Sequence, residues 1–301
     1  MISADKYNKN TTTKNADNNH NNMEGILQSI RRKAPKIHCI TNPVTMQDVA
    51  NILLAAGGSA IMARDPEEVS EITSICQGTL LNTGVPDERI LRSCILAGTR
   101  AHTLGHPVVL DPVGVGASSF RRKMLRELLA QVSPDVIRCN QEEAFVLNSL
   151  LSPSEKISHP AGVESSLSFD RETLASLALK TASLYQCVIL ISGNEDVVSD
   201  GTQVRFLQGG DPRIRRITGG GCMLSALCAL FACADAPLFE SISTTGHMWK
   251  LASLEAGLRT DLHSGGIGSF HVHLFDTLER LIYERSEEHT SELQSLPAIA
   301  Y

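Results

Sequence analysis

Short runs of continuous apolar residues alternate with longer amphipathic stretches between about residues 23 and 284. Continuous apolar runs are typical of strands buried on both faces, and the amphipathic stretches predict helices that pack on them. The predicted strands are Lys36–Thr41, Ser59–Met62, Thr79–Asn82, Pro107–Asp111, Asp135–Arg138, Cys187–Ser192 and a shorter edge strand at Gln203–Leu207. This alternation predicts an α/β fold with a mostly parallel central sheet and helices on both faces.

The helices predicted between and after these strands are Met46–Ala56, Pro66–Ile75, Asp87–Leu104, Phe120–Gln131, Gln141–Leu150, Arg171–Tyr185, Cys222–Cys233, Leu238–Leu258 and Val272–Tyr283. The stretch Ser152–Asp170 contains serine and proline and interrupts the alternation, so we expect a surface insertion there. No internal repeat or linker divides residues 23–284, and we therefore expect a single domain.

The two ends of the chain lack the alternating pattern. Residues 1–22 are rich in Asn, Thr and Lys, and such a composition predicts a disordered tail because it cannot bury enough apolar surface. The segment Arg285–Ser295 reads as the translation of a common sequencing-library adapter in one frame. We therefore expect residues 285–301 to be a non-native tail and leave both ends out of the fold prediction.

Composition and charge exclude several classes of protein. The chain of 301 residues is 42% hydrophobic, which allows a sizeable core, and its net charge of −6 without a basic block argues against nucleic acid as a partner. No apolar run is long enough for a membrane span, and the N-terminus lacks a secretory signal pattern. The eight cysteines are scattered without a paired spacing, which favours reduced thiols in a cytoplasmic protein.

Polar residues follow the predicted strands at the edge where ligands of open α/β sheets bind. They are Thr41 and Asn42, Arg64, Asn82 and Thr83, Asp111, Arg138 and Asn140, and Ser192. Any one of them alone is more often a cap or a turn residue. Because the carboxyl ends of parallel strands lie at the same edge, the whole set indicates a binding site there.

A run of three glycines, Gly219, Gly220 and Gly221, precedes Cys222 and an apolar helical stretch. Glycines allow positive φ and close approach of a ligand, and the N-terminus of a helix favours an anion, so the run predicts an oxyanion or phosphate turn. Cys222 would lie in the first turn of the helix, where we expect a lowered thiol pKa and a role as a base or nucleophile. The alternative is a glycine turn beside a buried, inert thiol.

Two carboxylates could serve a transferred phosphate. Asp111 ends a strand, and Glu143 begins a helix three residues after Asn140, a spacing that also fits a capping box. Mg²⁺ prefers one or two carboxylates with substrate oxygens and water, and Arg138 could clamp phosphate. With Cys222 to accept a proton, these parts predict a phosphotransferase acting on an alcohol.

Several longer motifs agree with a known family in order and spacing. They are Cys39–Val44, Ala50–Leu54 with Met62 and Ala63, Leu81–Gly84, Pro107–Ala117, Val136–Asn140 with Glu143, Ser192–Val197, Ile217–Ser225 and Gly266–Phe270. On these residues the chain resembles the hydroxyethylthiazole kinases of the ribokinase-like superfamily over roughly Ile26–Ile282. The resemblance implies ATP-dependent phosphorylation of 4-methyl-5-(2-hydroxyethyl)thiazole in thiamine salvage, with Mg²⁺ and ATP, by a homotrimer that has sites between its subunits.

The resemblance also implies a role for each site residue. It implies that Met62, Gly219 and Asn42 contact the substrate and that Arg138 and Ser192 contact ATP. It also implies that Asp111 and Glu143 bind Mg²⁺ and phosphate, and that Cys222 transfers the proton in place of the superfamily's usual aspartate. Two positions depart from the family pattern. Gly220 replaces the usual Thr, Ser or Ala, and Cys139 replaces a glycine, so that Cys139 would be strained if its position requires positive φ.

Three other functions stay open from the sequence. The nearest is a ribokinase-like kinase for another small alcohol, such as a hydroxymethylpyrimidine, although a cysteine where those enzymes have aspartate argues against it. A second is a binding or regulatory protein that keeps the fold without catalysis, although it would have no need of Asp111, Arg138, Glu143 and Cys222. A nucleotide-cofactor oxidoreductase is the weakest, because the glycine run comes late in the chain.

Overall fold

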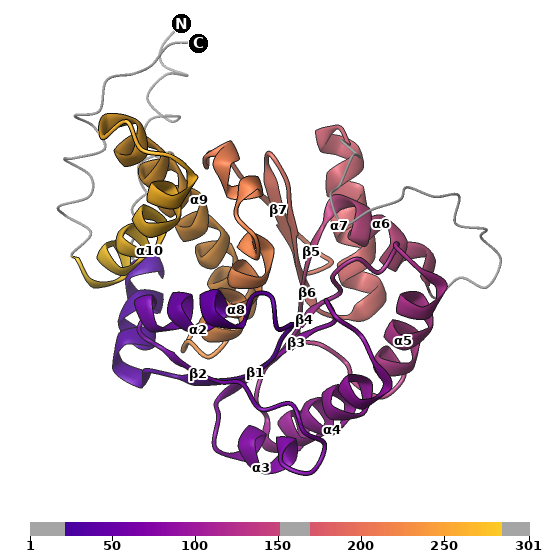
Figure 1. Cartoon of the computed structure of the whole chain (residues 1–301). Coiled ribbons are helices and arrows are strands. Elements are labelled where there is room, and N and C mark those ends of the chain that lie inside the picture. The colour runs from indigo at the N-terminus through magenta and orange to yellow at the C-terminus, as the bar shows by residue number, and fades with distance from the viewer. Residues whose placement is uncertain (1–21, 151–168, 285–301) are drawn as a thin grey trace, which may run out of the picture.

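The computed structural model describes residues 22–150 and 169–284, which form one sheet with helices on both of its faces (Figure 1). The strands are β1 (Lys36–Ile40), β2 (Ser59–Ile61), β3 (Gly78–Asn82), β4 (Val108–Asp111), β5 (Val136–Asn140), β6 (Val188–Ser192), β7 (Asp196–Ser199) and β8 (Val204–Leu207). The helices are α2 (Met46–Ala55), α3 (Val69–Ser74), α4 (Glu88–Leu104), α5 (Ser119–Leu129), α6 (Gln141–Leu150), α7 (Arg171–Tyr185), α8 (Gly220–Phe231), α9 (Leu238–Leu262) and α10 (Ile267–Tyr283), with a 3₁₀ helix η1 (Pro212–Arg216). A further helix over residues 22–33 precedes β1.

The sheet has eight strands in the order β2-β1-β3-β4-β5-β6-β7-β8. The strands from β2 to β6 are parallel, whereas β7 and β8 pair antiparallel at one edge. The predicted α/β class with a mostly parallel sheet is thereby confirmed. Because Asn82 pairs with Asp111 and Asn140 pairs with Ser192 in register, the ends of these strands line up at one edge of the sheet.

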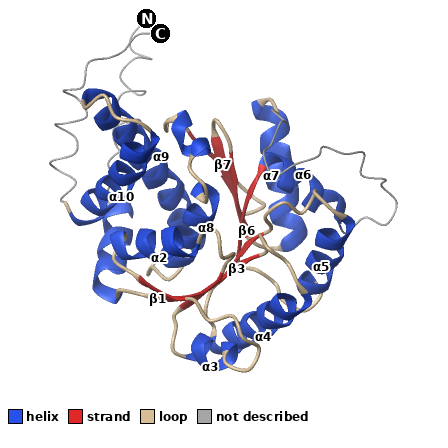
Figure 2. Cartoon of the chain, viewed as in Figure 1, coloured by secondary structure: helices blue, strands red, loops and turns tan. Residues whose placement is uncertain are grey.

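Two apolar cores lie on opposite faces of the sheet, and Figure 2 shows the helices that cover them. Helices α2, α8, α9 and α10 supply the core on one face, and α4, α5, α6 and α7 supply much of the other. Helix α8 is the most enclosed of these, since every residue from Cys222 to Phe231 is buried. Its N-terminus, which carries the three glycines, therefore has a fixed position over the middle of the sheet.

Several elements differ from the sequence prediction. Strand β7 was not predicted because its four residues begin with Asp196 and end with Ser199, so it resembles a polar turn although all four are buried. The helix over residues 22–33 and η1 were also missed, and α10 begins at Ile267 rather than Val272. The predicted N-terminal and adapter-derived tails lie outside the described residues except for residue 22, and so does most of the predicted insertion at Ser152–Asp170.

Among residues 22–150 and 169–284, no helix has the length and apolar character needed to cross a membrane.

Candidate active site

The glycine turn forms the N-terminus of α8, as predicted. Gly219 is the N-cap with φ of 84°, and a Cβ there would lie 2.7 Å from Cγ2 of Thr45, so the position suits only glycine. The first hydrogen bond of the helix runs from Met223 N to Gly219 O (2.8 Å), which leaves the amides of Gly221 and Cys222 ahead of the helical ladder. Amides in that position form an anion site.

The middle glycine of the turn, Gly220, departs from the family pattern and lies close to neighbouring backbone. A Cβ on Gly220 would lie 3.0 Å from the carbonyl oxygen of Ile214, and one on Gly221 would meet the guanidinium of Arg138. Close approach of the backbone therefore explains Gly220 and Gly221, and the turn keeps its amide donors.

Cys222 lies at the centre of a cluster of amide side chains. Its sulfur is 3.2 Å from Nδ2 of Asn82 and 3.6 Å from Nδ2 of Asn42, both of which donate to it. The residue is only 7% exposed. The structure therefore brings Cys222 together with Asn42, which the resemblance places at the substrate.

The sequence predicted a lowered pKa for the Cys222 thiol, and this prediction is wrong for the chain without bound ligands. Burial and, to a lesser extent, the nearby Asp111 carboxylate raise this pKa to about 11 in spite of the opposing effects of the Thr45 hydroxyl and the Asn82 amide. The position at a helix N-terminus was visible in the sequence, but burial and the neighbouring carboxylate arise from tertiary packing.

Asn82 connects the thiol to a buried carboxylate. The same Nδ2 atom that donates to Cys222 also donates to Oδ2 of Asp111 (2.8 Å), while Oδ1 of Asn82 accepts from Nδ2 of Asn42 and from the Gly84 amide. All hydrogen-bonding capacity of the amide is used, which fixes its orientation. Asn82 was among the polar residues at the strand ends but was not predicted as a site residue.

Ser225 is a second residue that the sequence analysis did not assign to the site. Its hydroxyl donates to Oδ2 of Asp111 at 2.8 Å. The available signal was its spacing, since Ser225 follows Cys222 by three residues and therefore lies on the same side of α8.

Asp111 and Ser192 are the last residues of β4 and β6, and Arg138 lies two residues before the end of β5, the strand between them. Arg138 Nη1 is 4.0 Å from Oδ1 of Asp111, and the Arg138 guanidinium donates to the hydroxyl of Ser192. Burial raises the pKa of Asp111, and the positive charge of Arg138 opposes that shift. These three predicted residues therefore form one connected polar group.

Glu143 makes the capping box that its spacing predicted. Its backbone amide donates to Oδ1 of Asn140, and the Asn140 amide donates to Oε2 of Glu143, both at 2.8 Å. The second carboxylate oxygen accepts from the Gly114 amide, also at 2.8 Å. Burial and the negative charge of Asp111 raise the pKa of Glu143 to about 7.

The side chains fit a divalent cation that arrives with a nucleotide better than a resident metal. Among the described residues there is no group of three or more His, Cys, Asp or Glu side chains that could hold a metal ion. Oδ1 of Asp111 is buried without a hydrogen-bond partner, whereas both oxygens of Glu143 already accept backbone amides. Asp111 could thus bind Mg²⁺ directly and Glu143 through water, with phosphate completing the shell.

Cys139 is not strained. It lies within β5, fully buried and opposite Ile191 of β6. The non-glycine residues with positive φ in the described part of the chain are Ala34, Gln186 and Ser264. A strand position accepts any side chain, so the replacement of the family's glycine does not disturb the backbone beside Asn140.

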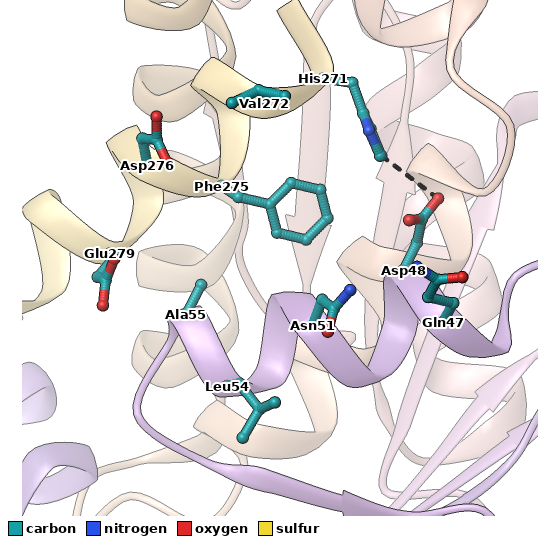
Figure 3. Close-up of a pocket in the computed structure, with 10 residues that line it drawn as sticks. All are labelled: Gln47, Asp48, Asn51, Leu54, Ala55, His271, Val272, Phe275, Asp276 and Glu279. Atoms are coloured by element: carbon teal, nitrogen blue, oxygen red, sulfur yellow. Dashed lines mark ion pairs between the residues drawn. The ribbon is translucent and has the colours of Figure 1, made fainter. Parts of the chain in front are cut away.

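Met62 is partly buried and packs against the apolar core that contains Cys222. It follows β2 at the edge of the sheet and lines a hollow of about 350 Å³ that also contains Arg64, Asp65 and Asp87. A larger hollow, of about 460 Å³, lies between α2 and α10, where Phe275 faces α2 and His271 pairs with Asp48 (Figure 3). None of the predicted site residues lines this second hollow, which is therefore a separate surface feature.

Comparison with known proteins gives a consistent result. A family model described as the hydroxyethylthiazole kinase family matches residues 27–284. The hydroxyethylthiazole kinase of Lysinibacillus sphaericus is 37% identical over 261 residues, which cover 86% of this chain and 97% of that protein. The sequence similarity therefore spans the sheet, the glycine turn and both cores.

Solved structures agree with this. The structure of a hydroxyethylthiazole kinase from Pyrococcus horikoshii matches with a TM-score of 0.74 and 31% identity, over 86% of this chain and 92% of that one. A ribokinase-like superfamily protein from Enterococcus faecalis matches with a TM-score of 0.57 and 12% identity, over 84% of this chain and 88% of that one, which is a likeness of fold. With its motifs, its sheet order and its matches in agreement, this ribokinase-like chain belongs to the hydroxyethylthiazole kinase family of phosphotransferases.

Proposed function

We propose that the chain transfers the terminal phosphoryl group of ATP to the hydroxyl of 4-methyl-5-(2-hydroxyethyl)thiazole, a step of thiamine salvage. The observation that carries this proposal is the position of Cys222 on the first turn of α8, beside Asn82 and above the buried Asp111. A proton acceptor, an anion-binding turn and a carboxylate for a cation thus meet within one site.

The strand order supports a division of this site into two halves. Met62 and Asn42 follow β2 and β1, and together with Gly219 they would contact the thiazole alcohol. Arg138 and Ser192 belong to β5 and β6 and would contact ATP. The glycine turn, Gly219–Gly221, lies between the halves and would bind the phosphoryl group during transfer.

The proton of the acceptor hydroxyl would pass to the thiolate form of Cys222, which the thiol would reach by losing its own proton to water once a cation on Asp111 offsets the carboxylate charge that raises its pKa. In a loose phosphoryl-transfer transition state this proton leaves late, so a weakly activated acceptor is sufficient. The amides of Asn42 and Asn82 donate to the sulfur and stabilise it when it carries negative charge. Mg²⁺, held by Asp111 and Glu143, would supply positive charge that offsets the charge of the phosphates and of the thiolate.

We also propose that the protein works as a cytoplasmic homotrimer. All eight cysteines are free, which suits a reducing compartment. The resemblance to the hydroxyethylthiazole kinases, which implies a homotrimer with sites between its subunits, supports this assembly. Light scattering of the purified protein tests this part, and a monomer at micromolar concentration would contradict it.

The test of function is ADP release from Mg-ATP with the hydroxyethylthiazole as acceptor. Parallel reactions contain a hydroxymethylpyrimidine or no acceptor. We expect ADP release that depends on the thiazole alcohol. Release with the pyrimidine alone would assign the chain to another small alcohol, and no release from folded protein would favour a binding role.

A further inference from the structure

A buried ion pair between Lys250 and Asp196 lies beside the nucleotide half of the site. Asp196 belongs to the motif Ser192–Val197, whereas Lys250 belongs to none of the family motifs. Nζ of Lys250, on α9, is 2.9 Å from Oδ1 of Asp196, the first residue of β7, and both side chains are buried. Removing two charges from water is costly unless their hydrogen bonds are complete. The position of such a pair next to the loop between β6 and β7 therefore calls for a reason.

We propose that Lys250 is a positioning residue for the nucleotide half of the site, an inference that rests on the proposed kinase function. Besides Asp196, its ammonium donates to the carbonyl oxygens of Gly193 and Asn194, both at 3.1 Å. The three donors of the ammonium thus meet three acceptors, two of which are backbone atoms of the β6–β7 loop.

Asp196 holds the same loop from its other side. Its Oδ1 atom accepts from the Gly193 amide at 2.8 Å. Together with Lys250, the carboxylate fixes both the N–H and the C=O of Gly193, the residue directly after Ser192. Since Ser192 accepts from the guanidinium of Arg138, the pair sets the position of both side chains expected to contact ATP.

The loop also reaches the segment that precedes the glycine turn. The side-chain oxygen of Asn194 accepts from the guanidinium of Arg215, in η1, two residues before Ile217. Gly210, with φ of 89°, leaves room for the aliphatic part of Lys250, whose Cδ atom would lie 3.0 Å from a Cβ at that position. Lys250 is therefore linked through Asn194 to the turn as well as to Ser192.

The first variant is Lys250→Met, which keeps the length of the side chain and removes its donors. We expect the Kd and the KM for Mg-ATP to rise about tenfold or more, because the loop carbonyls lose charged hydrogen bonds, while the KM for the thiazole alcohol stays within about twofold. Arg31→Met is the matched control, since it breaks the ion pair with Glu24 far from the sheet edge. The control should leave both constants near wild type.

A double variant separates positioning from charge balance. Lys250→Met combined with Asp196→Asn removes both charges and keeps an acceptor for the Gly193 amide. We expect it to recover the stability that the single variant loses, because no unpaired charge remains, while Mg-ATP binding stays weak. Recovery of ATP affinity together with stability, or an equal change in both KM values, would overturn the proposal.

A direct measurement of the Kd for Mg-ATP distinguishes failure of the positioning role from failure of the proposed kinase function. If the wild-type chain binds ATP but phosphorylates a different alcohol, the binding comparison still decides the role of Lys250. If the wild-type chain does not bind ATP, the positioning role is overturned together with the kinase function.

Discussion

The two halves of the sheet edge have opposite chemical character. The nucleotide half, at β4, β5 and β6, carries charged side chains that pair with one another, chiefly Asp111, Arg138 and Glu143. The half assigned to the acceptor alcohol, at β2, β1 and β3, places neutral side chains against Cys222, namely the amides of Asn42 and Asn82. The charged half suits a nucleotide polyphosphate, and the neutral half suits an uncharged heterocycle with one hydroxyl.

Cys222 lies at the boundary between these halves, and its contacts reflect both. Neutral amides donate to its sulfur, while the buried carboxylate of Asp111 holds its proton in place. In the proposed mechanism, phosphoryl transfer would therefore take place where the two environments meet. Variants at the boundary, in the charged half and in the neutral half should have distinct effects on kcat, on the two KM values and on stability.

The largest effect is expected at the boundary. Cys222→Ala should lower kcat by about a hundredfold to ten-thousandfold, because the proton loses its acceptor, while both substrates bind near normally. Cys222→Asp should keep activity, since a carboxylate can accept the same proton. Single-turnover kinetics measure the transfer step, and Cys228→Ala, at a buried position on the same helix, is the control. Lost binding with intact transfer would contradict this assignment.

A smaller but broad effect is expected in the charged half. Arg138→Met should raise the KM for ATP by about tenfold to a hundredfold and reduce the free energy of unfolding by about 3 kcal/mol, because Asp111 then stays buried without its counter-charge. Steady-state kinetics and urea unfolding measure the two quantities. Arg205→Met breaks a more exposed pair with Glu240 and should cost less than about 1 kcal/mol. If both variants unfold at the same urea concentration, the charged half does not depend on Arg138.

The neutral half is expected to be more tolerant. Asn82→Leu should lower kcat by about tenfold and stability by about 1–3 kcal/mol, because the variant removes the donor shared by Cys222 and Asp111. Asn82→Asp should be worse, since it places a second carboxylate against Asp111. Asn51→Leu, on the exposed side of α2, serves as the control. Equal activity of the Leu and Asp variants would show that neutrality at this position is unimportant.

The smallest effect concerns pH. His38, on β1, is fully buried and makes ring contacts to Thr73 and to the carbonyl of Ala63, beside Met62. Burial lowers its pKa. As pH falls, the imidazole is therefore protonated in the unfolded chain at a higher pH than in the folded chain. The free energy of unfolding should fall as pH drops below about 6.5, by at most about 1.4 kcal/mol per pH unit for this group. Thermal unfolding from pH 7.5 to 5.0 should show a shallower loss in His38→Gln, and an identical slope would exclude His38 as the cause.

The parallel part of the fold could be predicted because strands buried on both faces have continuous apolar runs in the sequence. The run Val108–Asp111 is an example, being apolar up to the aspartate that enters the site. Strand β7 could not be recognised, because nothing near Asp196 in the sequence shows that this residue is buried and paired with Lys250. That partner lies in the middle of a long helix and carries no local signal of its role.

The site was predictable in composition but not in its contacts. Asp111 and Ser192 end their strands and Arg138 lies two residues before the end of β5, so the parallel order of β4, β5 and β6 is enough to bring them together. The contact between Asn82 and Cys222 joins residues 140 positions apart and depends on where α8 crosses the sheet. The direction of the Cys222 pKa shift depends on the same packing, which explains why the local rule for helix N-termini was misleading.

The enclosure of Cys222 also has a consequence for the lifetime of the site. Peroxides and alkylating reagents attack the thiolate, and a thiol with a pKa of about 11 is ionised in roughly one molecule in ten thousand at pH 7. The side chain is, in addition, almost closed to solvent. The sulfur is therefore a poor target for peroxides and alkylating reagents as long as no substrate or cation is bound beside it.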